Sequence, residues 1–387
     1  MRCMRQPAVL VMAACLLVVP ALLRAEDAFR FTEKTHAGGA LRYVNEVPVL
    51  RVQGSAEEIG PQTAGLIGPA ATMIAEYPRK VLLRSNSEGI WQKLVEAGRA
   101  LWPRIPPAHR VELDTAARVA GVDRDMLVAG NIIMDVYRGL GCSSLVVEPC
   151  RSKTGGPLFG RNLDFYGMGF LHKYTLVTVC RPEGKHAFAS VGFAGLFGCI
   201  SGMNDAGLAL AVHEVLLSRD GSKLFDPTGV PYTFVFRRIL EECATVEEAE
   251  ALVRACKRTT MLSLAVCDRE KAVVLEMTPQ NVVVRPSRDG ILACTNHFRT
   301  KELAFFPFCS RYTTLAKSRE LGKLGVDDVA SRMDAVNMRI LTLQSMVFEL
   351  ETLKLHLAFG KIPASKGPFH TVDLKPLLAA DGAKAPL

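Results

Sequence analysis

The chain changes character at Gly141-Cys142. Before this pair, apolar residues recur mostly with the period of a helix; after it, they form short runs separated by turn residues. A chain whose first third is mostly helical and whose remainder is rich in strands must bury its sheet faces against each other or against helices. This order predicts an α+β protein with its boundary at a glycine-cysteine pair.

The order of the expected elements narrows the architecture further. After an extended segment at 40–53, helices are expected at 56–84, 88–102, 111–119 and 123–138. Strands follow at 143–147, 158–160, 174–180, 186–191, 197–203 and 208–215, then helices at 231–243 and 246–256. Strands return at 261–267, 271–277, 281–285 and 291–294, before a helix at 327–341 and a hairpin of 345–350 with 353–359. Two antiparallel sheets with helices outside, a four-layer αββα sandwich, accommodate this order.

Capping boxes mark the start of two of these helices. Ser55 with Glu58, and Thr245 with Glu248, place a hydroxyl and a carboxylate three residues apart, so that each can satisfy a backbone donor of the other residue. These two positions are therefore expected to begin helices.

Cys142 is the residue with the clearest chemical potential. If the Gly141-Cys142 bond were cut, Cys142 would become an N-terminus whose α-amino group titrates at about 7.7–8.0 and could activate its own thiol. Such a residue is nucleophile and base at once and needs no histidine. Gly141 leaves the bond open to attack and free to adopt strained dihedral angles. The alternative is that Cys142 is a small buried hydrophobic residue in a strand.

Four further polar residues could serve this cysteine. Arg161 and Asp164, expected to lie across a turn, could form a charged pair that orients the amine and stabilises the thiolate. Asn296, after an expected strand, could donate to a developing oxyanion, or it could only close a turn. Arg311 could hold a substrate carboxylate or the Asp164 carboxylate in a bidentate fork, or it could be a solvated surface residue.

A substrate pocket is harder to locate. Four phenylalanines near the Cys142 and Asp164 segments could line an apolar acyl pocket, or they could be ordinary core; they are Phe165, Phe170, Phe193 and Phe197. The polar pair His213-Glu214 in the strand expected at 208–215 could border a pocket or alternate to the wet face of a sheet.

Charge and motif content exclude several classes of function. Without residues 1–25 the chain has 44 basic and 39 acidic residues, a formal charge of +5 with no basic run, so no nucleic-acid partner is expected. The sequence contains no CxxC, HExxH or GxSxG motif and no glycine fingerprint of a nucleotide-binding loop. We therefore expect no metal and no cofactor.

The N-terminus resembles a secretory signal. Arg2 and Arg5 precede an apolar run at 8–23, and Ala25 offers a small residue at a cleavage point. We expect residues 1–25 to be removed and the protein to be secreted or periplasmic, with an uncleaved membrane anchor as the alternative. Nine cysteines remain, an odd number, so at least one thiol stays free, while others could pair in an oxidising compartment.

The motifs, taken in order, resemble the C45 acyltransferases and hydrolases, a group of N-terminal-nucleophile hydrolases that includes acyl-coenzyme A:isopenicillin N acyltransferase. More distantly they are similar to choloylglycine hydrolases and acid ceramidase-like amidases. The matching pieces span roughly 45–375: Val52-Gln53-Gly54-Ser55, Glu58-Ile59-Gly60, Gly141-Cys142-Ser143-Ser144, Gly160-Arg161-Asn162-Leu163-Asp164-Phe165, Gly202-Met203-Asn204-Asp205-Ala206-Gly207-Leu208, Thr295-Asn296-His297-Phe298 and Ser310-Arg311-Tyr312.

This resemblance implies an αββα precursor that cuts itself at Gly141-Cys142 into an α chain, 26–141, and a catalytic β chain, 142–387. It implies that Cys142 is the nucleophile, Arg161 and Asp164 orient it, Asn296 is the oxyanion donor and Arg311 lies near the nucleophile. Where choloylglycine hydrolases use a second asparagine, this chain has His213-Glu214. The expected substrate is a small N-acyl amide, cleaved through a thioester, with possible acyl transfer to an amine.

Two rival hypotheses remain at this point. A papain-like thiol hydrolase would use Cys142 with His213 or His297 and would need no cleavage. A secreted binding protein would keep the fold without catalysis.

Overall fold

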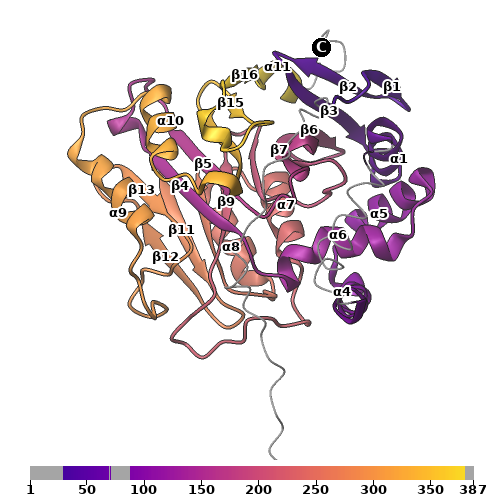
Figure 1. Cartoon of the computed structure of the whole chain (residues 1–387), viewed down its shortest axis with the longest axis horizontal. Helices are drawn as coiled ribbons and strands as arrows, with labels where there is room; N and C mark the ends of the chain where they lie inside the picture. Colours follow the sequence, from indigo (N-terminus) through magenta and orange to yellow (C-terminus); the bar gives the residue numbers. More distant parts are fainter. Residues whose placement is uncertain (1–28, 69, 71–87, 380–387) are drawn as a thin grey trace, which may run out of the picture.

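The computed structural model describes residues 29–68, 70 and 88–379 (Figure 1). The expected signal segment 1–25 lies outside these residues, as does most of the second half of the helix expected at 56–84. Within the described residues the chain forms two β-sheets with helices around them.

The larger sheet has ten strands in the order β1-β2-β3-β6-β7-β8-β9-β10-β11-β12. Their bounds are β1 Lys34–His36, β2 Gly39–Val44, β3 Val47–Gly54, β6 Thr175–Pro182, β7 Phe188–Phe193, β8 Ser201–Asn204, β9 Ala209–Glu214, β10 Leu262–Cys267, β11 Ala272–Met277 and β12 Val282–Pro286. All neighbours pair antiparallel except β3 and β6, which are parallel.

The smaller sheet has six strands in the order β13-β4-β5-β14-β15-β16, all antiparallel. Their bounds are β4 Gly141–Val147, β5 Leu158–Asp164, β13 Ile291–Cys294, β14 Thr342–Glu349, β15 Lys354–Ala358 and β16 His370–Asp373. The strand that begins at Gly141 thus lies between β13 and β5.

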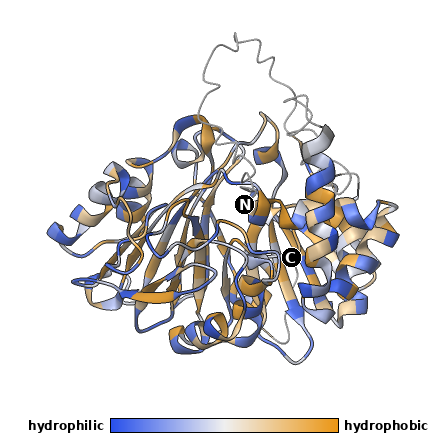
Figure 2. Cartoon of the chain, turned by 90° about the horizontal axis from the view of Figure 1, so that it is seen from below, coloured by the Kyte–Doolittle hydropathy of each residue, from blue (hydrophilic) through white to orange (hydrophobic). Residues whose placement is uncertain are grey.

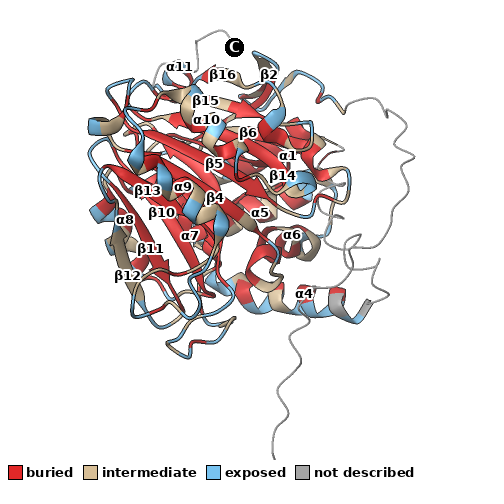
Figure 3. Cartoon of the chain, turned by 60° about the vertical axis from the view of Figure 1, so that its left-hand side comes forward, coloured by how far each residue is buried: buried red, intermediate tan, exposed pale blue. Residues whose placement is uncertain are grey.

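The two sheets face each other across an apolar core. Val177 of the larger sheet and Phe159 and Phe348 of the smaller one belong to this core and are fully buried. Figure 3 shows the central strands of both sheets as buried, and Figure 2 shows them as mostly hydrophobic; the edge strands β1 and β12 are only partly buried. Because both faces of each sheet are covered, the strands carry near-continuous apolar runs instead of a clear alternation.

Helices cover the outer faces of the sandwich (Figure 1). Against the larger sheet lie α1 Ala56–Ile67, α4 Glu88–Leu101, α5 Pro107–Ala120, α6 Arg124–Val136, α7 Tyr232–Glu242 and α8 Val246–Ala255. Against the smaller sheet lie α9 Ser310–Ala316 and α10 Val326–Asp334, and α11 Lys375–Leu378 ends the described chain. The four-layer αββα sandwich expected from the sequence is confirmed.

Both capping boxes begin helices as expected. Ser55 precedes α1, and its backbone N–H donates to Glu58 Oε2 at 2.8 Å. Thr245 precedes α8, and its hydroxyl accepts from the Glu248 backbone N–H at 3.3 Å.

The prediction that both sheets are wholly antiparallel is wrong for one pair. Val49 of β3 lies opposite Val177 of β6 in a parallel ladder. A parallel neighbour requires a long crossover connection, and here the helices of the first third and the β4-β5 hairpin of the other sheet supply it. The sequence also gave no signal for β1, β16 or α9, and α10 ends at Asp334 instead of extending to 341.

All nine cysteines in the described residues are free thiols, so none of the expected pairings is present among them. Of the helices in this part of the chain, none has the length and apolar content needed to cross a bilayer.

Candidate active site

Cys142 lies at the start of β4, fully buried, with its side chain directed toward the larger sheet. The direction follows from strand alternation, because Ser144, two residues on, reaches His213 Nε2 of β9 with its hydroxyl at 2.9 Å. Arg161 of β5 is opposite Ser144 in the register and therefore shares this face. Its Nε donates to Ser201 Oγ of β8 at 3.2 Å.

Arg161 is the largest fully buried side chain in the described residues, and its Nη1 and Nη2 atoms have no hydrogen-bond partner there. A buried guanidinium with two uncommitted nitrogens is a costly arrangement unless a negative group is bound at some stage. The Cys142 thiol shares this face with Arg161, and the positive charge of Arg161 favours the thiolate form.

The expected charged pair between Arg161 and Asp164 is not present. Both residues lie within strand β5 and not across a turn, and residues three apart in a strand point to opposite faces. Asp164 instead faces the layer of α9 and α10. Its Oδ1 accepts from Thr342 Oγ1 at 2.6 Å, and its Oδ2 lies 3.6 Å from Arg311 Nη1.

Asn296 spans the peptide that precedes Cys142. Its Oδ1 accepts from the Cys142 backbone N–H at 2.8 Å, while its Nδ2 donates to Leu140 O at 2.8 Å and to Glu214 O at 3.0 Å. Since the oxygen faces donors and the nitrogen faces acceptors, the orientation of the amide is fixed by its partners. Asn296 follows β13, as expected, and fixes the backbone on both sides of the Gly141-Cys142 bond.

Arg311 contacts both Cys142 and Asn296. Its Nη1 donates to Cys142 O at 3.0 Å, and its Nη2 donates to Asn296 Oδ1 at 2.8 Å. The guanidinium fork therefore holds the nucleophile segment and the amide together, and its approach to the Asp164 carboxylate at 3.6 Å is single and not bidentate.

Glu214 anchors the chain just before the glycine. Its Oε2 accepts from the backbone N–H groups of Gly139 and Leu140, each at 2.9 Å, and Arg138 Nη1 lies 3.9 Å from its Oε1. Burial of this carboxyl raises its pKa. In the uncut chain, therefore, Glu214 holds the segment that ends at Gly141 and does not border an open pocket.

Gly141 is required for space and not for an unusual backbone angle. Its φ is not positive, contrary to the strain expected from the sequence, but a Cβ at this position would lie 2.5 Å from Met338 Sδ. The close approach of Met338 explains why the residue before Cys142 is a glycine.

The electrostatics of the site depend mainly on burial. Burial raises the pKa of the Cys142 thiol, and the positive charge of Arg161 acts in the opposite direction. Burial also raises the pKa of the Asp164 carboxyl to about 6, although Thr342 and Arg311 stabilise its charged form. The thiol of the uncut chain is accordingly protonated at neutral pH.

Neither histidine considered as a base contacts Cys142 in the structure. His213 is fully buried between Ser144 Oγ and the backbone oxygen of Ser263, and burial lowers its pKa well below the usual value. His297 lies beside a different thiol, Cys309. His213 is therefore part of the contact between the sheets.

Cys309 was not identified from the sequence as a chemical site. It is half-buried; burial raises the pKa of its thiol, but hydrogen bonds from His297 and the Tyr312 backbone outweigh burial and lower this pKa to about 6. Such a thiol is ionised at neutral pH, in contrast to that of Cys142.

The four phenylalanines do not form one pocket. Phe165 is half-buried, and its ring lies 3.9 Å from where a Cβ of Gly139 would be, so it borders the segment before Cys142. Phe170 packs edge-on against Tyr174, with ring centroids 6.3 Å apart. Phe193 and Phe197 belong to the core between the larger sheet and its helices.

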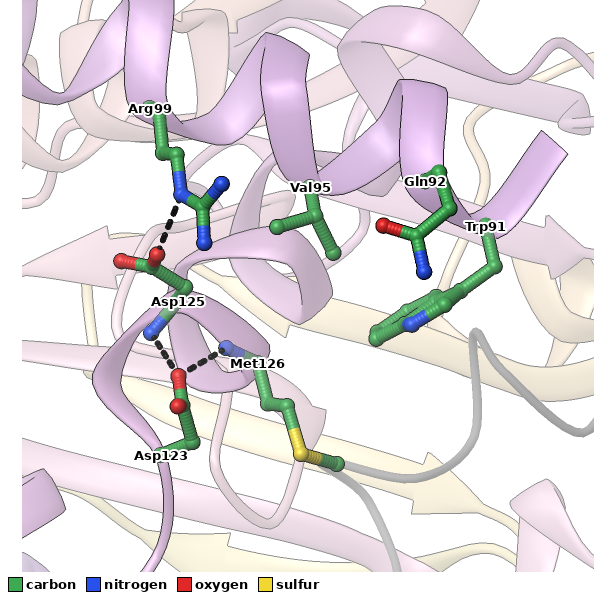
Figure 4. A pocket seen from close by; sticks show the side chains of 7 residues that line it. All are labelled: Trp91, Gln92, Val95, Arg99, Asp123, Asp125 and Met126. Carbon is green, nitrogen blue, oxygen red and sulfur yellow. Dashed lines mark hydrogen bonds and ion pairs between the residues drawn. The ribbon is translucent and has the colours of Figure 1, made fainter. Parts of the chain in front are cut away.

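Two cavities are distinct from the candidate site. Phe197 lines a small one, about 20 Å³, together with Glu112 and Arg237 on the helical side of the larger sheet. Another, about 170 Å³, lies between α4 and the start of α6 (Figure 4). Its lining residues are Trp91, Gln92, Val95, Arg99, Asp123, Asp125 and Met126.

Sequence reasoning missed the residues that hold the catalytic candidates in place. Thr342, Ser201 and Met338 come from segments far along the chain, and only the register of β5 with β14 brings Thr342 opposite Asp164. No local signal marks such partners.

Among the described residues no cluster of three or more His, Cys, Asp or Glu side chains could hold a metal ion.

Comparisons with solved structures give matches of low similarity. They include an N-acylethanolamine-hydrolyzing acid amidase ortholog from Caenorhabditis elegans, with 22% identity, a TM-score of 0.42, and coverage of 54% of this chain and 92% of that one. A variant of the conjugated bile acid hydrolase from Clostridium perfringens has 17% identity and a TM-score of 0.44, and the match covers 60% of this chain and 92% of that one. Penicillin V acylase from Agrobacterium tumefaciens has 14% identity and a TM-score of 0.35, and the match covers 62% of this chain and 93% of that one.

The sequence comparisons are more decisive. No curated protein matches the chain. The family model described as acyl-coenzyme A:6-aminopenicillanic acid acyl-transferase matches residues 150–360, more than half of the chain. The matched segment contains Arg161, Asp164, Asn296 and Arg311 and begins shortly after Cys142. The chain therefore belongs to the acyl-coenzyme A:6-aminopenicillanic acid acyl-transferase family, and it is an enzyme of the acyltransferase class.

Proposed function

We propose that the protein is a secreted precursor that cuts itself at Gly141-Cys142 and then cleaves a linear amide through a thioester on Cys142. The observation that carries this proposal is the position of Asn296, which bonds the Cys142 N–H and the Leu140 carbonyl on either side of the bond to be cut. A strand cysteine with a purely structural role would not need this fixation from both sides.

The proposed self-cleavage proceeds by acyl transfer within the chain. The Cys142 thiol attacks the Gly141 carbonyl carbon, a C–S bond forms and the C–N bond breaks, with the thiol proton passing to the departing amine. Water then hydrolyses the thioester, which leaves a carboxylate on Gly141 and a free thiol and amine on Cys142. Glu214 and Asn296 hold the attacked segment, and Arg311 holds Cys142 O.

The same residues would then act on a substrate. When the segment 138–141 leaves, the Nδ2 group of Asn296 loses Leu140 O as a partner and becomes available to a substrate oxyanion. The new amine of Cys142 takes the thiol proton as the thiolate attacks and returns it to the leaving amine. Arg161, on the same face as Cys142, stabilises the thiolate, while Asp164 orients the segment through Arg311.

The substrate class that fits is a small N-acyl amide. A thioester can be resolved by water, which gives hydrolysis, or by an amine, which gives acyl transfer. The α chain, 26–141, stays as the partner of the β chain, 142–387, in this proposal. Secretion through residues 1–25, with an uncleaved anchor as the alternative, is part of the same proposal.

The histidine-dependent alternative is less consistent with the geometry, because the contacts of His213 and His297 lie with Ser144, Ser263 and Cys309. A binding protein without catalysis would not need the buried guanidinium of Arg161, whose Nη1 and Nη2 atoms lack hydrogen-bond partners, on the same face as a thiol.

Intact-mass measurement of the purified protein tests the proposal. We expect a fragment that begins at Cys142 in the wild type and an uncut chain in Cys142→Ala. Cys309→Ala serves as the matched control, since it removes another thiol near the site and should leave the cut unchanged. An unbroken wild-type chain that nevertheless hydrolyses N-acyl amides would refute self-processing and favour the histidine-dependent reaction.

A further inference from the structure

Five large apolar side chains are exposed on two loops next to the candidate site. Leu216 and Leu217 are 48% and 61% exposed, and Phe305, Phe306 and Phe308 are 66%, 69% and 74% exposed. We call these five residues the apolar rim. The described residues contain only four other exposed large apolar side chains, and these are scattered over Val119, Tyr166, Leu321 and Ile340. A soluble monomer rarely exposes apolar groups in such a cluster without a binding role.

The two loops are joined to each other. The Arg219 backbone N–H donates to Leu303 O at 3.1 Å, and Ser218 Oγ reaches the same oxygen at 3.4 Å. Beneath them, Val215 of one loop and Phe298 and Leu303 of the other belong to a single buried cluster. The rim is therefore carried by a packed base and not by two independent loops.

The rim also adjoins the residues of the candidate site. Leu216 follows Glu214 by two residues, and Phe308 precedes Arg311 by three. Arg299 ties the second loop down, because its guanidinium donates to Pro307 O and lies 3.7 Å from the centre of the Tyr312 ring. A surface that engages the rim would thus lie close to the segments that hold Cys142.

The exposed charges around the rim are mostly positive. Arg219, Lys223 and Lys301 are exposed on the same two loops. Of the acidic groups there, only Glu302 is exposed. Asp220 is held by Ser222, Thr278 and Asn281, and Asp226 is held by Thr228. Apolar side chains flanked by cations match the boundary of a bilayer, where acyl chains lie beneath anionic headgroups.

We propose that the apolar rim inserts into the surface of a lipid bilayer that contains anionic lipid, with Arg219, Lys223 and Lys301 at the headgroups. This inference goes beyond the proposed function, because it does not require that Cys142 cleave anything. A second copy of the chain fits less well. A twofold contact through the rim would bring the three exposed cations of each copy together with only one exposed acid, Glu302, in each, so like charges would dominate the contact.

Vesicle cosedimentation tests the proposal in the full chain carrying Cys142→Ala, so that processing cannot affect the result. Vesicles of phosphatidylcholine are compared with vesicles that also contain phosphatidylserine. The rim variant carries Phe305→Ser, Phe306→Ser and Phe308→Ser, and the control variant carries Val119→Ser on α5. All of these chains keep the apolar run at 8–23, so any binding that it causes is common to them.

We expect the rim variant to bind phosphatidylserine-containing vesicles at least tenfold more weakly than its parent and the control variant to bind as its parent does. A charge variant, Lys223→Glu with Lys301→Glu, should lose the preference for phosphatidylserine, and added salt should have the same effect. Because these side chains are exposed, the thermal unfolding midpoints of both variants should equal that of their parent. If the rim variant does unfold, vesicle binding by the charge variant tests the proposal alone. Equal binding by parent and variants would overturn the proposal, as would a parent dimer that the rim variant dissociates.

Discussion

The Asn296 side chain accepts a hydrogen bond through its oxygen and donates hydrogen bonds through its nitrogen, and Asn296→Asp separates these two roles. The substitution keeps the shape and the oxygen that accepts from the Cys142 N–H and from Arg311, at 2.8 Å each. It removes the donor to Leu140 O at 2.8 Å and to Glu214 O at 3.0 Å and places a second oxygen against these carbonyls. The substitution also adds a negative charge beside Arg311; the lost donor to Leu140 O is the change that acts on the segment before the cut.

The magnitude follows from the contacts. Two lost hydrogen bonds, at a net value of about 1 kcal/mol each, should lower the free energy of unfolding of the precursor by roughly 2 kcal/mol. Loss of a donor to a developing oxyanion typically slows acyl transfer by about 10² to 10³, or some 3–4 kcal/mol of transition-state stabilisation. We expect amide hydrolysis to fall by that order. Processing should fall by about fivefold, because there the same donor only holds Leu140 O through one hydrogen bond of about 1 kcal/mol.

Cell-free synthesis followed by intact-mass measurement at timed intervals gives the processing rate, and denaturant unfolding of the Cys142→Ala precursor gives the stability. Asn45→Asp is a matched control, because Asn45 Nδ2 also donates to a backbone oxygen, that of Thr371, at 2.8 Å but in another part of the molecule. If Asn296→Asp is processed within about threefold of the wild-type rate while folded, the amide donor has no role in the cut and our reasoning fails.

Three further outcomes follow from burial and charge. Cys309, whose pKa is lowered to about 6, should react with iodoacetamide at neutral pH well before the buried Cys142 thiol of an uncut chain. Peptide mass mapping measures both rates, and equal rates would contradict the site geometry. The Asp164 carboxyl has a pKa of about 6 in the folded protein, above its value of 3.8 in the unfolded chain, so the folded state binds the proton more tightly. The contribution of Asp164 to the free energy of unfolding should therefore fall by about 2–3 kcal/mol as the pH rises from about 4 to about 6. In a Cys142→Ala background, Asp164→Asn should remove this fall, and unfolding curves with the same pH slope in both proteins would rule it out. Glu112→Ala removes the bidentate partner of the buried Arg237 guanidinium at 2.6 Å and leaves Glu241 as its carboxylate partner. It should cost about 3 kcal/mol in denaturant unfolding, whereas a loss under 1 kcal/mol would mean that the Glu112–Arg237 pair is dispensable.

Local patterns in the sequence predicted the elements well where a local cause exists. Ser55 and Thr245 begin helices because a hydroxyl and a carboxylate three residues apart satisfy backbone donors, and this needs no tertiary contact. The parallel pairing of β3 with β6 could not be predicted in this way, since more than a hundred residues separate the strands. Register and topology depend on long-range burial, which spacing along the chain does not encode.

In the candidate site, too, local sequence patterns predicted some features, while others depend on contacts between distant segments. Cys142 and Asn296 were predicted as site residues from residue type and position, and the structure places them in contact. The expected pair of Arg161 with Asp164 failed because the segment continues as a strand, so the two side chains emerge on opposite faces. Glu214 was noted only as a polar residue in an apolar strand, and its two bonds to Gly139 and Leu140 require the tertiary structure.

The position of the proposed cut also explains how a chain can be divided without losing its sheets. The α chain would keep β1, β2 and β3, which form one edge of the larger sheet, and β3 would remain paired with β6 of the β chain. It would contribute only Gly141 to the smaller sheet, at the first position of β4. The other hydrogen-bonded pairs of β4 belong to the β chain, so Cys142 would become an N-terminus while the strand that carries it stays between β13 and β5. A bond at the first residue of a central strand is thus one of the few places where cleavage frees an amine next to a thiol already fixed by the fold.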